Sequence, residues 1–162
     1  FGDDINTDLI MPQVAFALPL EEQIRYVFRA NRPGWVEQVR EGDIIVAGRN
    51  FGTGSSRPGA QLLRAVGIRC LVADSINGLF FRNCINFALP PLQCPGVSRI
   101  FEEGDEAAVN LLTGEVKNIR SGEVRQGEKL PEFLLNILQA GGIIPMLEGQ
   151  GYLEPAEAPG EE

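Results

Sequence analysis

The sequence contains no histidine among its 162 residues. Without an imidazole, the chain can provide neither a Ser-His-Asp triad nor a Cys-His pair, and it cannot bind zinc through histidine. Basic residues are also few, with 14 Lys and Arg against 22 Asp and Glu and a net charge of −8. A broad basic face for nucleic acid is therefore not expected. No uncharged apolar run approaches the roughly 20 residues of a membrane-spanning helix, so no membrane partner is expected either.

Cysteine is scarce, with only Cys70, Cys84 and Cys94 in the chain. Their spacing contains no CxxC pair, and an odd number of thiols is a poor disulfide framework. We expect ordinary buried thiols in a reducing, cytoplasmic setting. Iron–sulfur clusters usually take four thiolates, so we expect this chain to bind no metal and no cofactor by itself.

The length suits one domain with one core, and a hydrophobic content of 44% is typical of globular chains. The acidic opening lacks the basic start of a secretory signal. The end of the chain is acidic and contains several prolines. We therefore expect one domain over residues 1–150 and a disordered acidic tail over residues 151–162.

Apolar runs and turn residues alternate along the chain in the manner of an α/β domain. Strands are predicted at 43–48, 69–73 and 88–92, a hairpin at 107–112 and 115–119, and helices at 20–30, 58–66, 75–87 and 131–139. Gly67 is expected to end the second of these helices. A strand, a helix and a strand within about 30 residues predict a βαβ unit with locally parallel strands, so the expected fold is α/β with a mixed sheet.

The loop between the first strand and the following helix has the sequence GTGSSR at positions 52–57. Ser55 or Ser56 is expected to cap that helix, with Pro58 in its first turn. The two glycines allow a ligand to approach the backbone, the hydroxyls can donate or accept, and Arg57 can bind a carboxylate in bidentate fashion. Ligands of α/β sheets gather at such strand ends, and helix N-termini attract anions.

The pattern of this loop leaves its ligand open. No Lys follows the second glycine as in a Walker loop, the third glycine of a dinucleotide fingerprint is missing, and the GxSxG pattern of a nucleophile elbow is absent. A carboxylate is a good candidate, and a purely structural strand-to-helix turn is the alternative.

The stretch VAGRNFGTGSSR at 46–57 closely resembles the active-site loop of the aconitase superfamily's swivel domain, and in particular that of the 3-isopropylmalate dehydratase small subunits. Residues 2–12 resemble the opening of those subunits, and residues 80–90 resemble their second helix and following strand. Residues 104–112 fall where they have a similar Gly-Asp hairpin segment. The resemblance covers nearly the whole chain apart from the tail, and it implies a single swivelling β/β/α domain.

The resemblance also implies a hydro-lyase that removes water from a hydroxy acid and adds it back at the adjacent carbon. Ser55 matches the catalytic base, Arg57 matches the arginine that binds a substrate carboxylate, and Ser56 matches a second serine. Thr53 and Gly54 would complete the substrate site. A separate large subunit would hold a 4Fe–4S cluster, and the small subunit would close over it as a heterodimer or heterotetramer.

Two further segments take roles from the resemblance. Thr7 and Asp8 match a pair near the active-site entrance, for which a turn or capping role is the alternative. The segment that falls at the specificity loop consists of Ala15, Phe16, Ala17 and Leu18. Relatives that accept a third carboxylate tend to place Arg there, so this apolar segment favours an alkyl substituent such as isopropyl.

The chain departs from the family pattern at three positions of the loop. Thr53 replaces the usual Cys, and Pro58-Gly59 replaces a Glu-His pair. The second change removes a carboxylate and an imidazole beside the site, which leaves other substituted malates, such as dimethylmalate or homoaconitate, as alternative substrates. A non-catalytic anion-binding module of the same fold is a further alternative.

Overall fold

The computed structural model describes residues 1–54 and 57–155. Its helices are α1 Thr7–Ile10, α2 Leu20–Gln23, α3 Trp35–Gln38, α4 Gly59–Val66, α5 Gly78–Asn86, α6 Glu132–Gln139 and α7 Ile143–Gly149. Its strands are β1 Ile44–Ala47, β2 Cys70–Ala73, β3 Pro91–Gln93, β4 Ala107–Asn110, β5 Glu115–Asn118 and β6 Val124–Gln126. Short 3-10 turns are η1 Gln13–Ala15, η2 Ile24–Tyr26 and η3 Val97–Arg99.

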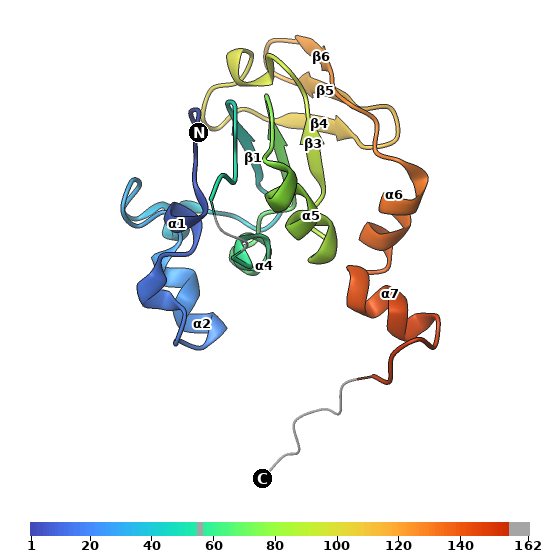
Figure 1. Cartoon of the computed structure of the whole chain (residues 1–162). Helices are drawn as coiled ribbons and strands as arrows, with labels where there is room; N and C mark the ends of the chain where they lie inside the picture. Colours follow the sequence, from blue (N-terminus) through green and yellow to red (C-terminus); the bar gives the residue numbers. More distant parts are fainter. Residues whose placement is uncertain (55–56, 156–162) are drawn as a thin grey trace.

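Strands β1, β2 and β3 form a parallel sheet in that order, with α4 and α5 as the connections (Figure 1). Each strand is a short apolar run, and all four residues of the central strand β2 are buried. A strand that is covered on both faces has no solvent side, so its sequence is continuously apolar rather than alternating. The predicted βαβ unit is confirmed.

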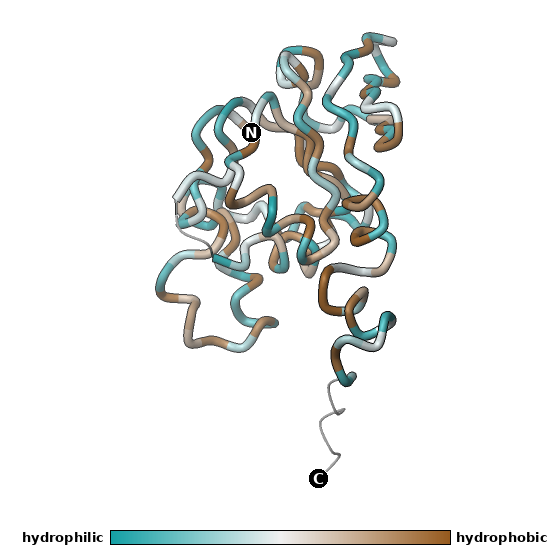
Figure 2. Tube along the Cα trace, turned by 45° about the vertical axis from the view of Figure 1, so that its right-hand side comes forward, coloured by the Kyte–Doolittle hydropathy of each residue, from teal (hydrophilic) through white to brown (hydrophobic). Residues whose placement is uncertain are grey.

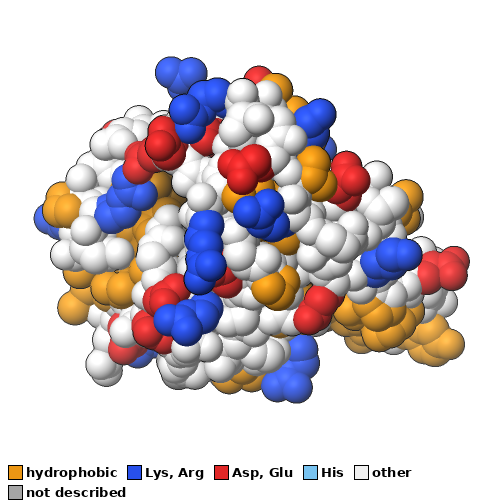
Figure 3. Space-filling view, turned by 90° about the horizontal axis from the view of Figure 1, so that it is seen from above, with side chains coloured by type: hydrophobic (Ala, Val, Ile, Leu, Met, Phe, Trp, Pro, Cys, Tyr) orange, Lys and Arg blue, Asp and Glu red, His pale blue; other side chains and the backbone are white. Residues whose placement is uncertain are grey.

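The second sheet is antiparallel, with the order β4-β5-β6 and Val109 opposite Val116. Its strands alternate between buried and exposed residues, as expected for a sheet with one solvent face. The outer surface of the molecule on this side carries interspersed acidic and basic side chains (Figure 3). The predicted hairpin around Thr113 and Gly114 is confirmed.

The two faces of the parallel sheet contact different layers. Leu71 of β2 lies in one apolar cluster with Leu63 of α4 and Phe80 of α5. Its neighbour Val72 points the other way and lies in a second cluster with Val116 of β5. Hydrophobic segments therefore gather in the interior of the trace (Figure 2). The fold is a three-layer α/β domain of helices, parallel sheet and antiparallel sheet.

The structure confirms the α/β class and corrects several details of the prediction. The parallel and antiparallel strands lie in two three-stranded sheets rather than in one mixed sheet. The helix predicted at 20–30 ends earlier, because Phe28 has a φ of 54° that no right-handed helix accommodates. The helix predicted at 75–87 begins at Gly78, and β6 and α7 were not predicted.

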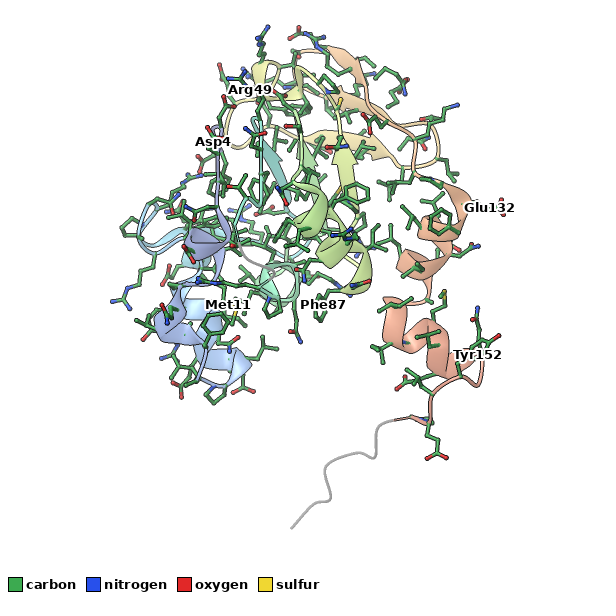
Figure 4. All side chains as sticks on the ribbon, viewed as in Figure 1. Asp4, Met11, Arg49, Phe87, Glu132 and Tyr152 are labelled. Atoms are coloured by element: carbon green, nitrogen blue, oxygen red, sulfur yellow. The ribbon has the colours of Figure 1, made fainter. Side chains whose placement is uncertain are left out.

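The C-terminal helices α6 and α7 lie beside α5 at one side of the molecule (Figure 1). Glu132 marks the start of α6 and Tyr152 follows α7, at the outer edge (Figure 4). Most of the predicted tail, residues 156–162, lies outside the described residues. In the part of the chain that is described, no helix has the length and apolar character needed to cross a membrane.

Candidate active site

The opening segment of the chain runs parallel to the segment that follows β1. The backbone N–H of Asp4 donates to the carbonyl of Arg49 at 2.8 Å, and that of Thr7 donates to the carbonyl of Thr53 at 2.8 Å. Figure 4 shows Asp4 and Arg49 near each other at the upper part of this pairing. Two of the sequence segments that carry the resemblance are thereby placed side by side at the carboxyl end of β1.

The loop backbone lies too close to its neighbours for larger residues at two positions. Gly52 has a φ of +82°, and a Cβ there would stand 2.3 Å from Phe80 of α5. Gly54 has a φ of +112°, and a Cβ there would stand 2.8 Å from Oγ1 of Thr7. Both positions therefore require glycine, for its backbone conformation and for space. The loop is held between α1 and α5.

Arg57 is the charged centre of the site. Its side chain is only 15% exposed and forms an ion pair with Asp8 of α1. One terminal nitrogen also donates to the carbonyl of Met11 at 2.7 Å, and the guanidinium lies over the ring of Phe16 at 5.0 Å. The structure thus brings together three residues that the sequence singled out in three separate segments. The carbonyl of Met11 was missed, because any residue type offers a backbone acceptor.

Two polar side-chain atoms at the site are buried with no hydrogen-bond partner among the described residues. They are Nε of Arg57 and Oγ1 of Thr7. A buried polar atom without a partner costs free energy, so such atoms are uncommon in a folded chain. Both atoms border the loop that contains Gly54, where a bound polar group could satisfy them.

The predicted specificity segment has two different environments. Ala15 is fully buried in η1 and belongs to the core, whereas Phe16 is 48% exposed and covers the guanidinium of Arg57. Ala17 is exposed and Leu18 is half-buried. Phe16 is therefore the member of this segment that the structure places directly against the site.

Ser55 and Ser56 lie outside the described residues. The helix that follows begins at Gly59, and its N-cap position is Pro58 with no side-chain cap. The prediction that one of the serines caps this helix is therefore wrong. The reason is that the helix starts later than the sequence indicated, which puts a residue without a polar side chain at the cap.

The start of α4 instead depends on α5. The side-chain oxygen of Asn83 accepts a hydrogen bond from the backbone N–H of Ala60 at 3.1 Å. A Cβ on Gly59 would stand 2.9 Å from Ile10 and 3.1 Å from Phe80. A larger residue at position 59 would therefore require Ile10 and Phe80 to move. From the sequence, position 83 falls in the predicted helix at 75–87 and receives no role of its own.

The arrangement is suited to holding a small carboxylate. An arginine can bind a carboxylate in two-point fashion, and the ring of Phe16 shields one face of the guanidinium from water. In this structure the carboxylate of Asp8, itself 67% exposed, takes that place. The ion pair between Arg57 and Asp8 is therefore the same kind of contact that a bound carboxylate would make with Arg57.

The three cysteines take no part in this site. All are free and buried, and burial raises the pKa of Cys70 to about 12 and that of Cys84 well above its usual value. Burial also raises the pKa of Cys94. Thiols in this state are protonated at neutral pH and are poor metal ligands. Within residues 1–54 and 57–155, no group of three His, Cys, Asp or Glu side chains could hold a metal ion.

Comparison with known proteins agrees with the fold. Residues 26–96 match the family described as the aconitase C-terminal domain. The isopropylmalate/citramalate isomerase small subunit of Methanocaldococcus jannaschii is 47% identical over 151 residues, covering 91% of this chain and 89% of that protein. The 3-isopropylmalate dehydratase small subunit 1 of Methanopyrus kandleri is 45% identical over 153 residues, covering 93% and 90%.

A solved structure shows the same fold. The crystal structure of 3-isopropylmalate dehydratase (leuD) from Methanocaldococcus jannaschii superimposes with a TM-score of 0.85 at 30% identity, covering 94% of this chain and 91% of that one. The likeness therefore extends over both sheets and the helices between them. The chain belongs to the 3-isopropylmalate dehydratase small-subunit family of the aconitase superfamily.

Proposed function

We propose that this chain is the small subunit of a hydro-lyase that interconverts 2-isopropylmalate and 3-isopropylmalate in leucine biosynthesis. The observation that carries the proposal is the mostly buried Arg57, which follows Ser55 on the loop and pairs with the carboxylate of Asp8. Family membership supports the reaction type, and the arginine supports a carboxylic-acid substrate.

The reaction removes a proton from the carbon next to a carboxylate and a hydroxide from the adjacent carbon. It then adds water back with the positions of the hydrogen and the hydroxyl exchanged. As the proton leaves, negative charge develops on that carboxylate. Arg57 would stabilise this charge through its guanidinium, which is held in place before the reaction by Met11 and Phe16. Ser55 would take the proton and later return it.

A serine hydroxyl is by itself too weak a base for this step. Its deprotonated form would need a nearby positive group and exclusion of water, and Arg57 could supply the positive group. The N–H groups of Thr53, Gly54 and Ser56 are further candidate donors to the substrate. They belong to a loop that can come close to a ligand because of its glycines.

Thr7 and Asp8 would support this site from α1. Asp8 would release Arg57 or share it when the substrate carboxylate arrives, and the buried hydroxyl of Thr7 would gain a partner at the loop. The exposed Phe16 and Ala17, with Leu18 beside them, would offer an apolar wall for the isopropyl group.

A large subunit is part of the proposal, because the relatives are described as small subunits. We place a 4Fe–4S cluster on that partner, where it would bind the substrate hydroxyl that leaves. The present chain would close over it as a heterodimer or heterotetramer. The three free thiols support a reducing, cytoplasmic setting for the assembly.

The proposal is tested by Ser55→Ala in a complex reconstituted anaerobically with a matching large subunit. Loss of a positioned base lowers turnover by about 10²–10⁴-fold, and we expect that loss with an unchanged melting temperature and unchanged assembly. Ser56→Ala is the matched control and should be milder. If Ser56→Ala loses turnover while Ser55→Ala retains it, the roles are shifted by one residue. If both retain it, the loop is structural and the proposed mechanism fails.

A second candidate substrate comes from one relative, which is described as an isopropylmalate/citramalate isomerase small subunit. An apolar pocket discriminates only about 10–200-fold for each methylene-sized difference, so a smaller alkyl malate could also be accepted. Turnover should be compared for isopropylmalate, citramalate, dimethylmalate and homoaconitate. Absence of turnover with all of them would favour a non-catalytic anion-binding module.

A further inference from the structure

Helix α5 contacts the chain at both ends of the GTGSSR loop at positions 52–57. Its Phe80 lies directly beneath Gly52, where the loop begins, and against Gly59, where α4 begins. Phe80 is 2% exposed and also contacts Phe51, with the ring centroids 5.7 Å apart. One side chain of α5 therefore sets how closely both ends of the loop can approach the core.

A second side chain of α5 holds the first turn of α4. The first N–H groups of a helix have no partner within the helix and need an acceptor from outside. Pro58 at the N-cap position supplies none, and Ala60 is fully buried, so water cannot easily substitute. Asn83 supplies the acceptor for the N–H of Ala60 from the facing helix.

The hydrogen bond from Ala60 to Asn83 lies close to Arg57 along the sequence. The N–H of Gly59 donates to the carbonyl of Arg57 at 2.7 Å, so the backbone of Arg57 is joined directly to the turn that Asn83 holds. A shift of that turn would therefore move Arg57.

We propose that Asn83 is a positioning residue for the reaction of this site, acting through the start of α4 on Arg57. The inference rests on the proposed function for its kinetic consequence, but its structural consequence can be measured without it. The carboxamide is suited to this role because it accepts a hydrogen bond without charge. A carboxylate would accept the same bond but would add a negative charge beside a site for anions.

The test uses Asn83→Leu, which keeps the size of the side chain and removes the acceptor, and Asn83→Asp, which keeps the acceptor. Asn86→Ala on the same helix is the matched control, because its side chain is exposed. Asn83→Ala is a second variant without an acceptor, in case the leucine disturbs folding. Hydrogen exchange of the Ala60 amide is measured by NMR in the isolated chain, and kcat and KM are measured in the reconstituted complex.

We expect the Ala60 amide to exchange about tenfold faster in Asn83→Leu and at the wild-type rate in Asn83→Asp and Asn86→Ala. In the complex, Asn83→Leu should lower kcat by about 10- to 100-fold, since small misplacements of reacting groups cost that much. Asn83→Asp should keep kcat near the wild-type value and raise KM, because its charge opposes the anionic substrate.

Unchanged exchange and unchanged kcat in both Asn83→Leu and Asn83→Ala would overturn the inference. Failure of Asn83→Asp to restore the exchange rate would also overturn it, because the acceptor would then not be what matters. An inactive wild-type complex would contradict the proposed function instead, and the exchange rates would still decide whether Asn83 holds the helix start.

Discussion

The two sheets of this domain differ in what they give to the site. The parallel sheet is buried on both faces, and its connections leave at the strand ends, where they form the loop that contains Arg57. The antiparallel sheet is joined by tight turns and has one solvent face. The difference indicates that functional groups in this fold come from long connections that a fully covered sheet holds in place.

The arginines of the two regions show the same contrast. Arg120, beside the antiparallel sheet, is exposed and is paired with the exposed Glu102 and with Asp105, whose side chain is only 6% exposed. Arg57 is mostly buried, and its Nε has no partner among the described residues. The exposed guanidinium of Arg120 already has its carboxylate partners, whereas a mostly buried guanidinium with a donor that has no partner among the described residues is suited to binding an anion.

The largest expected effect comes from replacing these two arginines by lysine. Arg57→Lys should lower the turnover of the complex by about 10²–10³-fold, because an ammonium group cannot reproduce the planar two-point contact with a carboxylate. Arg120→Lys should leave turnover within about twofold. Steady-state kinetics of both variants in the reconstituted complex measures the difference, and equal losses would contradict the assignment of the site.

A smaller effect is expected from two glycines with similar backbone angles. Gly52→Ala should destabilise the chain by about 2–5 kcal/mol, since the left-handed conformation costs about 1–2 and overpacking against Phe80 costs about 1–3. Gly122 has a φ of +77° and open space around it. Gly122→Ala should therefore lower the free energy of unfolding by only about 1–2 kcal/mol. Urea unfolding of both alanine variants measures this. Equal losses would show that the loop is not tightly held against α5.

The smallest expected effect is on acid stability. The guanidinium of Arg120 and the N–H of Glu102 lower the pKa of Asp105 to about 2. Because this pKa is lower in the folded chain than in the unfolded one, ionised Asp105 stabilises the fold. This contribution is complete above about pH 4, the pKa of an unfolded aspartate, and is lost as the pH falls toward 2. Asp105→Asn should reduce the fall of the melting temperature over that interval. The pKa of Asp3 is lowered to a lesser extent by Arg49, so Asp3→Asn should change the pH profile less. The reverse order would contradict this account.

Much of the fold could be predicted from the sequence where local chemistry decides it. The apolar run of β1, the glycine that ends α4 at a φ of 114° and the Thr113-Gly114 turn all depend on nearby residues. The division into two sheets could not be predicted, since hydrophobic periodicity does not say which strands pair. Strand β6 was missed because VRQ has only one hydrophobic residue. Helix α7 was missed because it contains a proline and follows two glycines.

The residues of the candidate site could be proposed from the sequence, but their contacts could not. Arg57 was identified from the loop pattern and the resemblance, and Asp8 and Phe16 from the resemblance alone. Their contacts with one another appear only in the structure. The carbonyl of Met11 carries no signal in its side chain, and the role of Asn83 depends on how two helices face each other. Tertiary contacts of these kinds lie outside what periodicity and motif spacing can specify.

The pairing of the opening segment with the loop after β1 also has a consequence for how the protein folds. Arg57 and Met11, which are hydrogen-bonded, lie 46 residues apart in the sequence. Bringing such distant segments together lowers the entropy of the chain before any stabilising contact between them forms. Contacts between distant segments therefore tend to slow folding. During synthesis the opening segment must wait until β1 and the loop have left the ribosome. We therefore expect the site to be completed late in folding, after the local turns and helices have formed.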